Sequence, residues 1–202
     1  EQTLIVKIKP SGVHELVSRG FSVELWAKVI RMGLRQALNL VGGTTFQGIQ
    51  SWKEADCAYK PNTFRPYEND WPTLVIECGV SESLNRLRVE SRWWLENSVE
   101  GVNIVLLFSI SKKARSIHIE KWEMATHSSP HVAQAGLSHL IGTPTKIQEV
   151  DISGPVVPTD ESAGTTPIVT GAPLELDFTK IFLRQPVQGC SEGSIIFTEQ
   201  EL

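Results

Sequence analysis

Two acidic residues stand at the edges of short apolar segments in the middle of the chain. Asp56 precedes residues 57–59, and Glu77 follows the continuous run at 73–76. A short apolar run rich in β-branched residues is typical of a buried strand, so we expect Glu77 where a core strand emerges. A carboxylate in that position needs a partner or a metal ion. Two carboxylates on neighbouring strand ends could hold a hard divalent cation over a phosphodiester.

A plainer interpretation of the same residues involves no chemistry. Asp56 would begin a strand after a turn, and Glu77 would pair with a nearby arginine. Other features of the sequence bear on the choice between these two interpretations.

Length and composition indicate one α/β domain with an appendage, or at most two small domains. The chain has 202 residues, of which 41% are hydrophobic and 21% are charged, enough to bury a core. A net charge of -4 argues against tight non-specific binding of nucleic acid. It leaves open an enzyme that recruits metal ions to an acidic site. Since no apolar run approaches the length of a bilayer span, we expect no membrane segment.

Cysteine usage predicts an intracellular protein of the cytoplasm or nucleus. The three cysteines show neither a CxxC spacing nor a disulfide framework. Cys57 and Cys78 fall on expected strands, and buried thiols favour a reducing compartment. Residues 1–4 contain neither a methionine nor a signal-peptide pattern, as in a trimmed chain, so targeting stays open.

The order of expected elements is a helix, three strands, a helix and two strands. Residues 4–8 predict a short strand before the first helix, which runs over 22–41 with Ser22 as its N-cap and Gly33 as a close-packing point inside it. Strands are expected at 44–49, 56–59 and 73–77, then a helix capped by Ser81 or Ser83 that ends near 97. The last two strands are expected at 102–110 and 116–124. This order predicts an α/β fold with a mixed central sheet flanked by helices.

Three regions follow from the change in composition along the chain. Residues 1–124 form the α/β core. Residues 125–173, dominated by Pro, Gly, Ser and Thr, predict a poorly ordered linker or insertion. Residues 174–202 predict C-terminal strands, at 174–178, 181–184 and 194–197, that pack back on the core in a loop-rich extension.

The chain resembles the PD-(D/E)xK nuclease superfamily, whose restriction-endonuclease-like core has the order αβββαβ. Within it the resemblance is closer to an uncharacterised fungal group and to related bacterial proteins assigned as restriction endonucleases. It covers most of residues 40–124 and the tail. The motifs that carry it are residues 53–56 (KEAD), 71–79 (WPTLVIECG), 81–83 (SES), 87–88 (LR), 93–95 (WWL), 117–122 (IHIEKW) and 178–184 (FTKIFLR).

The resemblance implies a metal-dependent nuclease that acts on DNA or RNA. Asp56 and Glu77 match the metal-binding acids, and the backbone carbonyl of Cys78 falls where it would complete the metal shell. Glu24 on the first helix is a weaker candidate for a further acidic ligand. The implied cofactor is Mg²⁺ or Mn²⁺.

Two departures from the family pattern bear on activity. Ala55 replaces the proline before the aspartate, and Gly79 replaces a lysine. That lysine would orient the attacking water and stabilise charge on the phosphate. Arg88 or Arg92 on the following helix could supply the charge, although an arginine does not act as a base. Both could instead form an exposed helix face paired with neighbouring glutamates.

Three hypotheses therefore stand. The first is a metal-dependent phosphodiesterase that uses Asp56 and Glu77, with Arg88 and Arg92 as candidate cations. The second is a nuclease-like domain that has lost its chemistry and binds nucleic acid or protein. The third is an interaction domain whose protein partner binds through residues 125–202. The sequence leaves the choice between DNA and RNA, and the oligomeric state, open.

Overall fold

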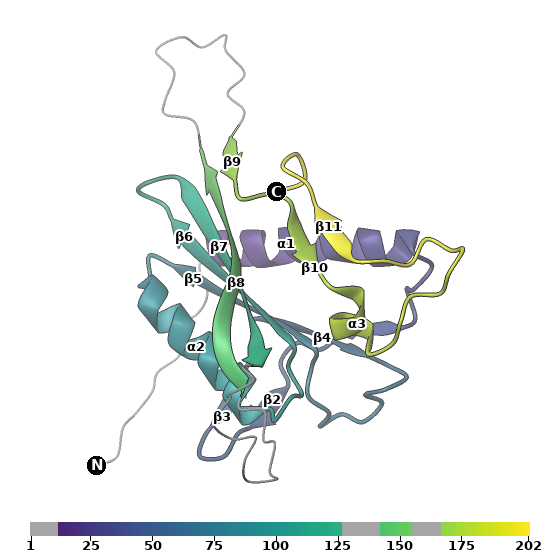
Figure 1. The fold of residues 1–202 in the computed structure, drawn as a ribbon. Helices are drawn as coiled ribbons and strands as arrows, with labels where there is room; N and C mark the ends of the chain where they lie inside the picture. Colours follow the sequence, from purple (N-terminus) through teal and green to yellow (C-terminus); the bar gives the residue numbers. More distant parts are fainter. Residues whose placement is uncertain (1–11, 127–141, 155–166) are drawn as a thin grey trace, which may run out of the picture.

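A computed structural model describes residues 12–126, 142–154 and 167–202 of the chain. Its centre is a seven-stranded mixed sheet with helices on both faces (Figure 1). The strand order is β1-β4-β5-β6-β7-β8-β9. β5 and β6 pair in parallel, and every other neighbouring pair is antiparallel. The strands are β1 (Leu38–Leu40), β4 (Cys57–Pro61), β5 (Leu74–Val80), β6 (Ile104–Ser111), β7 (Ser116–Thr126), β8 (Gly142–Ser153) and β9 (Ile168–Thr170).

Each face of the sheet carries its own hydrophobic core. One face is covered by α1 (Gly12–Arg31), α3 (Phe178–Phe182) and the short pair β10 (Leu174–Leu176) and β11 (Ile195–Phe197). The other face is covered by α2 (Leu84–Asn97) and the hairpin of β2 (Thr45–Gln47) and β3 (Trp52–Glu54). Leu74 and Ile76 belong to the first core, whereas Val75 belongs to the second. This alternation is the one expected of a central strand covered on both sides.

The expected mixed α/β architecture is confirmed. The helices and the first strands of the main sheet follow the order α1-β1-β4-β5-α2-β6, which is αβββαβ. α2 makes the crossover between the parallel strands β5 and β6, as a parallel pair requires. Ser83 caps α2 and accepts from the amide of Arg86, one of the two caps expected from the sequence.

The expected bounds of the first helix are wrong. The helix runs over Gly12–Arg31, so Ser22 lies inside it instead of capping it. Gly33 adopts φ +76 just after the helix, a left-handed conformation that glycine takes readily and that ends helices. Residues 38–40, expected to be helical, instead form the edge strand β1 against β4. The strand expected at 4–8 lies outside the described residues.

The strand expected at 44–49 exists only in part and does not join the main sheet. β2 pairs with β3 in a separate two-stranded hairpin. The turn of this hairpin rests on α2, where the amide of Ile49 donates to Oδ1 of Asn97 at 3.0 Å. An added Cβ at Gly48 would lie 2.6 Å from the same oxygen, so only glycine allows this approach.

The expectation of a poorly ordered linker at 125–173 is wrong for the residues that the structure describes. β8 is a 12-residue strand that pairs with β7 along its length, and β9 extends the sheet beyond it. Much of β8 is polar and half exposed, which is why its apolar pattern gives little signal. Residues 127–141 and 155–166 lie outside the described residues.

The C-terminal residues pack back on the core as expected. Leu174, Phe178 and Phe197 join the α1-side core, and Asn103 donates to the carbonyl of Lys180 at 2.7 Å. Residues 178–182 form α3, with Asp177 as its N-cap, where the sequence predicted strand residues.

Candidate functional site

Strand register brings the two predicted acids together. Cys57 at the start of β4 faces Ile76 of β5 in an antiparallel pair. Asp56 lies in a bend directly before Cys57, and Glu77 follows Ile76 on β5, so the two acids flank this pair. The charge of Asp56 contributes to a raised pKa of Glu77, as expected for two close carboxylates.

Asp56 is held from two sides. Its Oδ2 accepts a hydrogen bond from the backbone amide of Cys78 at 2.8 Å and lies 3.0 Å from Nε2 of His14. His14 comes from the first turn of α1, and the side chains of His14 and Asp56 are only 12% and 13% exposed. α1 therefore supplies a polar group to the site, although it is a histidine and not the expected glutamate.

Glu77 is a buried carboxylate on the α2 face of the sheet. Its Oε1 accepts a hydrogen bond from the indole Nε1 of Trp94 at 2.6 Å and lies 3.5 Å from Nζ of Lys53. Burial raises the pKa of Glu77 to about 7, against the opposing charge of Lys53 and with a further rise from Asp56. A buried carboxyl with a pKa near neutrality beside a second acid is a common feature of functional sites.

The β2–β3 hairpin places Lys53 beside Glu77. Besides Glu77 it pairs with Glu90 of α2, and its Nζ lies 5.9 Å from the ring centroids of both Trp93 and Trp94. Its side chain is 14% exposed. An ammonium group is therefore fixed beside Glu77 by a segment that precedes Asp56 in the sequence.

Docking of the hairpin on α2 is what positions Lys53. The indole Nε1 of Trp93 donates to Oγ of Ser51 at 2.7 Å, next to the bond between Ile49 and Asn97. These contacts fix the turn of the hairpin on the last turns of α2. Trp93 and Trp94 therefore serve packing and positioning, as their spacing on the helix suggests.

Gly79 occupies a crowded place at the position of the family lysine. An added Cβ would lie 3.0 Å from Cδ1 of Leu87 and 3.1 Å from Cβ and Oε2 of Glu82. Leu87 is a buried residue of α2, so it has little room to move. The close packing of α2 on β5 therefore leaves little room for a side chain at position 79.

Arg88 and Arg92 lie elsewhere than at the acid pair. Arg88 makes a two-pronged ion pair with Glu120 of β7, with N–O distances of 2.5–3.2 Å, while Arg92 is exposed. In the described part of the chain, no hydrogen bond or ion pair joins either arginine to Asp56 or Glu77.

The partner of Arg88 is a carboxylate with no exposed surface. Burial alone would raise the pKa of Glu120, but hydrogen bonds from Arg88, Trp122 and His118 lower it to about 2. Arg88 therefore pairs with a glutamate of the sheet, and the expectation that it pairs with glutamates of its own helix on an exposed face is wrong.

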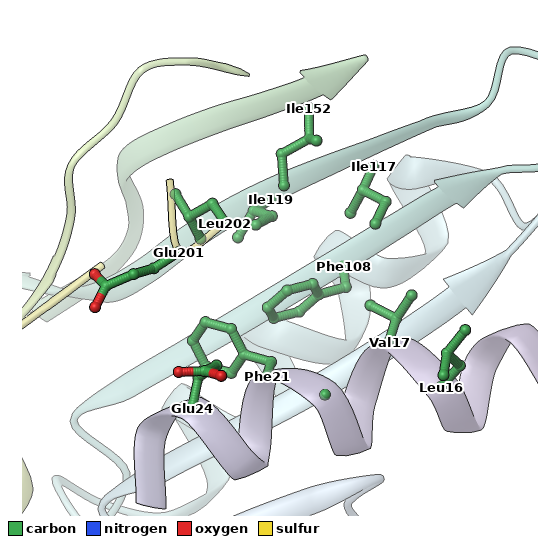
Figure 2. A pocket seen from close by; sticks show the side chains of 11 residues that line it. Leu16, Val17, Phe21, Glu24, Phe108, Ile117, Ile119, Ile152, Glu201 and Leu202 are labelled. Atoms are coloured by element: carbon green, nitrogen blue, oxygen red, sulfur yellow. The ribbon is translucent and has the colours of Figure 1, made fainter. Parts of the chain in front are cut away.

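Glu24 lines a separate apolar groove on the α1 face, with a volume of about 200 Å³ (Figure 2). Its companions there include Phe21, Phe108, Ile152 and Glu201, and neither predicted acid is among the lining residues. The structure therefore does not bring Glu24 to Asp56. The role of the Cys78 carbonyl stays a prediction.

Sequence reasoning missed two residues that the fold places at the acids. Lys53 lies three residues before Asp56, inside a motif already noted, but no strand was expected at residues 52–54. His14 precedes the expected start of the first helix, so nothing in the pattern directed it toward the sheet.

Among the described residues, no helix is both long and apolar enough to cross a membrane.

Comparison with known proteins adds little to this picture. No family model matches the chain, and no curated protein matches it. Among solved structures, it is similar to the crystal structure of a protein from Anabaena variabilis ATCC 29413 described as a "putative nuclease belonging to DUF820". The two share 13% identity with a TM-score of 0.42, over 64% of this chain and 79% of the other. A likeness of this size carries no conclusion, so fold and function are argued from the residues of this chain.

Proposed function

We propose that this protein is a metal-dependent nuclease that hydrolyses phosphodiester bonds in DNA or RNA. The observation that carries the proposal is the closeness of Asp56, directly before β4, to Glu77 of β5, where its charge adds to the rise that burial causes in the pKa of Glu77. The Lys53 ammonium lies 3.5 Å from Glu77. Two acids and one cation at one site match what phosphodiester hydrolysis needs: ligands for a metal ion and a positive charge near the phosphate.

The donor types at the acid pair fit Mg²⁺ or Mn²⁺. Asp56 and Glu77 offer carboxylate oxygens, which hard cations prefer, and the carbonyl of Cys78 follows Glu77 on the same strand. Burial raises the pKa of Glu77 to about 7, and a divalent ion would offset the cost of a buried charge there. The bound ion would polarise the phosphate and favour ionisation of a water molecule.

Lys53 takes the role that the sequence assigned to Arg88 or Arg92. Its ammonium would orient the attacking water and stabilise charge on the phosphate, and a lysine can lose its proton where an arginine cannot. His14 and the amide of Cys78 hold Asp56 in place. Trp94 does the same for Glu77.

A second candidate function is a nuclease-like module that binds nucleic acid or protein without cleaving it. The observation that favours it is Lys53, whose ammonium is already paired with both Glu77 and Glu90. Such a network can be purely structural. An intracellular setting fits both functions, because Cys57 and Cys78 are buried free thiols.

A cleavage assay tests the proposal. Purified wild type, Asp56→Asn, Glu77→Gln and Lys53→Met are incubated with single- and double-stranded DNA and RNA in Mg²⁺, Mn²⁺ or EDTA. Arg92→Ala, an exposed change on α2, is the matched control. We expect metal-dependent cleavage that falls at least about 100-fold in the three site variants and is unchanged in the control.

Two outcomes would count against hydrolysis at this site. Cleavage that all variants share marks a contaminating nuclease. No cleavage, together with salt-sensitive binding of a labelled oligonucleotide, supports the binding module instead.

A further inference from the structure

A second group of metal-type donors meets on the α1 side of Asp56. His14 of α1, Asp56 and the thiol of Cys78 each offer one ligand atom, and these atoms lie within 4.8 Å of one another. The three residues come from distant parts of the sequence, so only the fold brings them together. We propose that they form a binding site for a borderline-soft transition metal ion, with Zn²⁺ as the best match.

The chemistry of the donors selects this class of metal. Zn²⁺ binds histidine nitrogen, cysteine sulfur and carboxylate oxygen, whereas Mg²⁺ and Ca²⁺ take oxygen ligands. A set of one nitrogen, one oxygen and one sulfur is therefore unsuited to the hard ion proposed for the acid pair.

The two metal sites lie on opposite faces of β5. Cys78 belongs to the core beneath α1, while Glu77 contacts Trp94 of α2. Successive side chains of a strand point to opposite faces, so the thiol cannot join Glu77 around one ion. Asp56, directly before β4, is the residue common to both, and the Zn²⁺ proposal does not depend on hydrolysis.

The local geometry suits an ion between the donors. Nε2 of His14 lies 3.0 Å from Oδ2 of Asp56, close to the roughly 3.3 Å between two ligand atoms of a tetrahedral ion with bonds of about 2.0–2.1 Å. The amide of Cys78 donates to the same carboxylate at 2.8 Å and fixes it in place. Outer contacts of this kind orient the ligands of many metal sites.

Burial makes the site enclosed but reachable. Cys78 is 6% exposed, whereas the side chains of His14 and Asp56 retain 12% and 13% of their surface. An ion can therefore reach the thiol past these two side chains. On binding, the Cys78 thiol becomes a thiolate and its proton leaves to solvent.

Cobalt substitution tests this site directly. Co²⁺ is titrated into metal-free wild type under reducing conditions, and the thiolate-to-metal charge-transfer band is followed in the near ultraviolet. We expect a band that saturates at one equivalent, is displaced by Zn²⁺, and is lost in Cys78→Ser and His14→Ala.

Matched controls come from the other cysteines. Cys57 is buried on the same face but bonds to Oγ of Ser22 at 3.2 Å, and Cys190 is exposed. Cys57→Ser and Cys190→Ser should keep the band. Glu77→Gln should also keep it while losing any Mg²⁺-dependent cleavage, which separates failure of this site from failure of the proposed nuclease.

Three results would overturn the site. They are no band in wild type, a band that survives Cys78→Ser, and a band that disappears in Cys190→Ser. The wild-type titration needs no variant, so a misfolded variant leaves the test intact. Far-ultraviolet circular dichroism checks the fold of each variant. Zn²⁺ should raise the Tm of wild type, Cys57→Ser and Cys190→Ser, but not that of Cys78→Ser or His14→Ala.

Discussion

The indole of Trp94 donates a hydrogen bond to the buried carboxylate of Glu77 at 2.6 Å. α2 thus contributes a hydrogen-bond donor at the point where β5 places a carboxyl group in the core. Neither this bond nor the ammonium of Lys53 offsets burial fully, since the pKa of Glu77 is raised to about 7. Glu77 therefore costs the folded protein stability at neutral pH, as functional groups in cores often do.

The first prediction concerns Glu77 and pH. The pKa of Glu77 is about 7 in the folded chain, against an ordinary value of 4.5. Between these two pH values the folded state keeps a proton on Glu77 that the unfolded state has released. The contribution of Glu77 to stability is then most favourable below pH 4.5 and falls by about 3 kcal/mol as the pH rises through 7. Glu77→Gln should remove this loss, so its stability relative to wild type should improve by that amount between pH 4.5 and pH 8. Urea unfolding in EDTA measures it, and an equal difference at both pH values would contradict the raised pKa.

The second prediction concerns Arg88 and Arg92. Arg88→Ala should lower the free energy of unfolding by about 3 kcal/mol, because it leaves the fully buried Glu120 without its main partner. Arg92→Ala, on the exposed face of the same helix, should change it by less than about 0.5 kcal/mol. Since the pKa of Glu120 is lowered to about 2, the Arg88 effect should persist above pH 4.5 and shrink as the pH falls toward 2. Equal effects of the two substitutions on urea unfolding at pH 7 would refute this assignment.

The third prediction concerns the hairpin that carries Lys53. A Cβ at Gly48 would meet Oδ1 of Asn97 at 2.6 Å and Cζ2 of Trp93 at 2.8 Å. Gly48→Ala should loosen the hairpin from α2, with amide hydrogen exchange at residues 45–54 about tenfold faster. Gly42→Ala, whose Cβ meets nothing within 4 Å, is the control. Unchanged exchange in Gly48→Ala would show that the turn does not depend on this close approach.

The fourth prediction concerns Gly79. Gly79→Lys should destabilise the protein by about 1–3 kcal/mol and leave cleavage no faster, because the new side chain presses on Leu87 and Glu82. The double variant with Leu87→Ala should lose less stability than the sum of the losses in the two single variants, because the smaller side chain leaves space for the lysine. Thermal unfolding and the cleavage assay check both. A gain of activity in Gly79→Lys alone would mean that α2 yields easily.

Local signals in the sequence accounted for the elements around the acids. The continuous apolar run before Glu77 predicted β5, and Ser83 predicted the start of α2. Both predictions were possible because these features depend on neighbours within a few residues. The adjacency of β4 and β5, expected from the sequence, brings Asp56 and Glu77 into the same region. By contrast, β8 has half-exposed polar residues whose strand conformation depends on pairing with β7, so its composition resembled that of a linker.

The sequence by itself predicted the mixed α/β class, the strand before Glu77 and the helix after it, and it indicated Asp56 and Glu77 as candidate metal ligands. Only the tertiary structure decided what surrounds those acids: Lys53 from a docked hairpin, His14 from the start of α1 and Trp94 from α2. In the folded chain Arg88 also pairs with Glu120, and Glu24 lines a separate groove. The physical reason is that the pattern of apolar residues encodes which face of an element is buried. Which polar side chains then meet depends on packing between elements far apart in the chain.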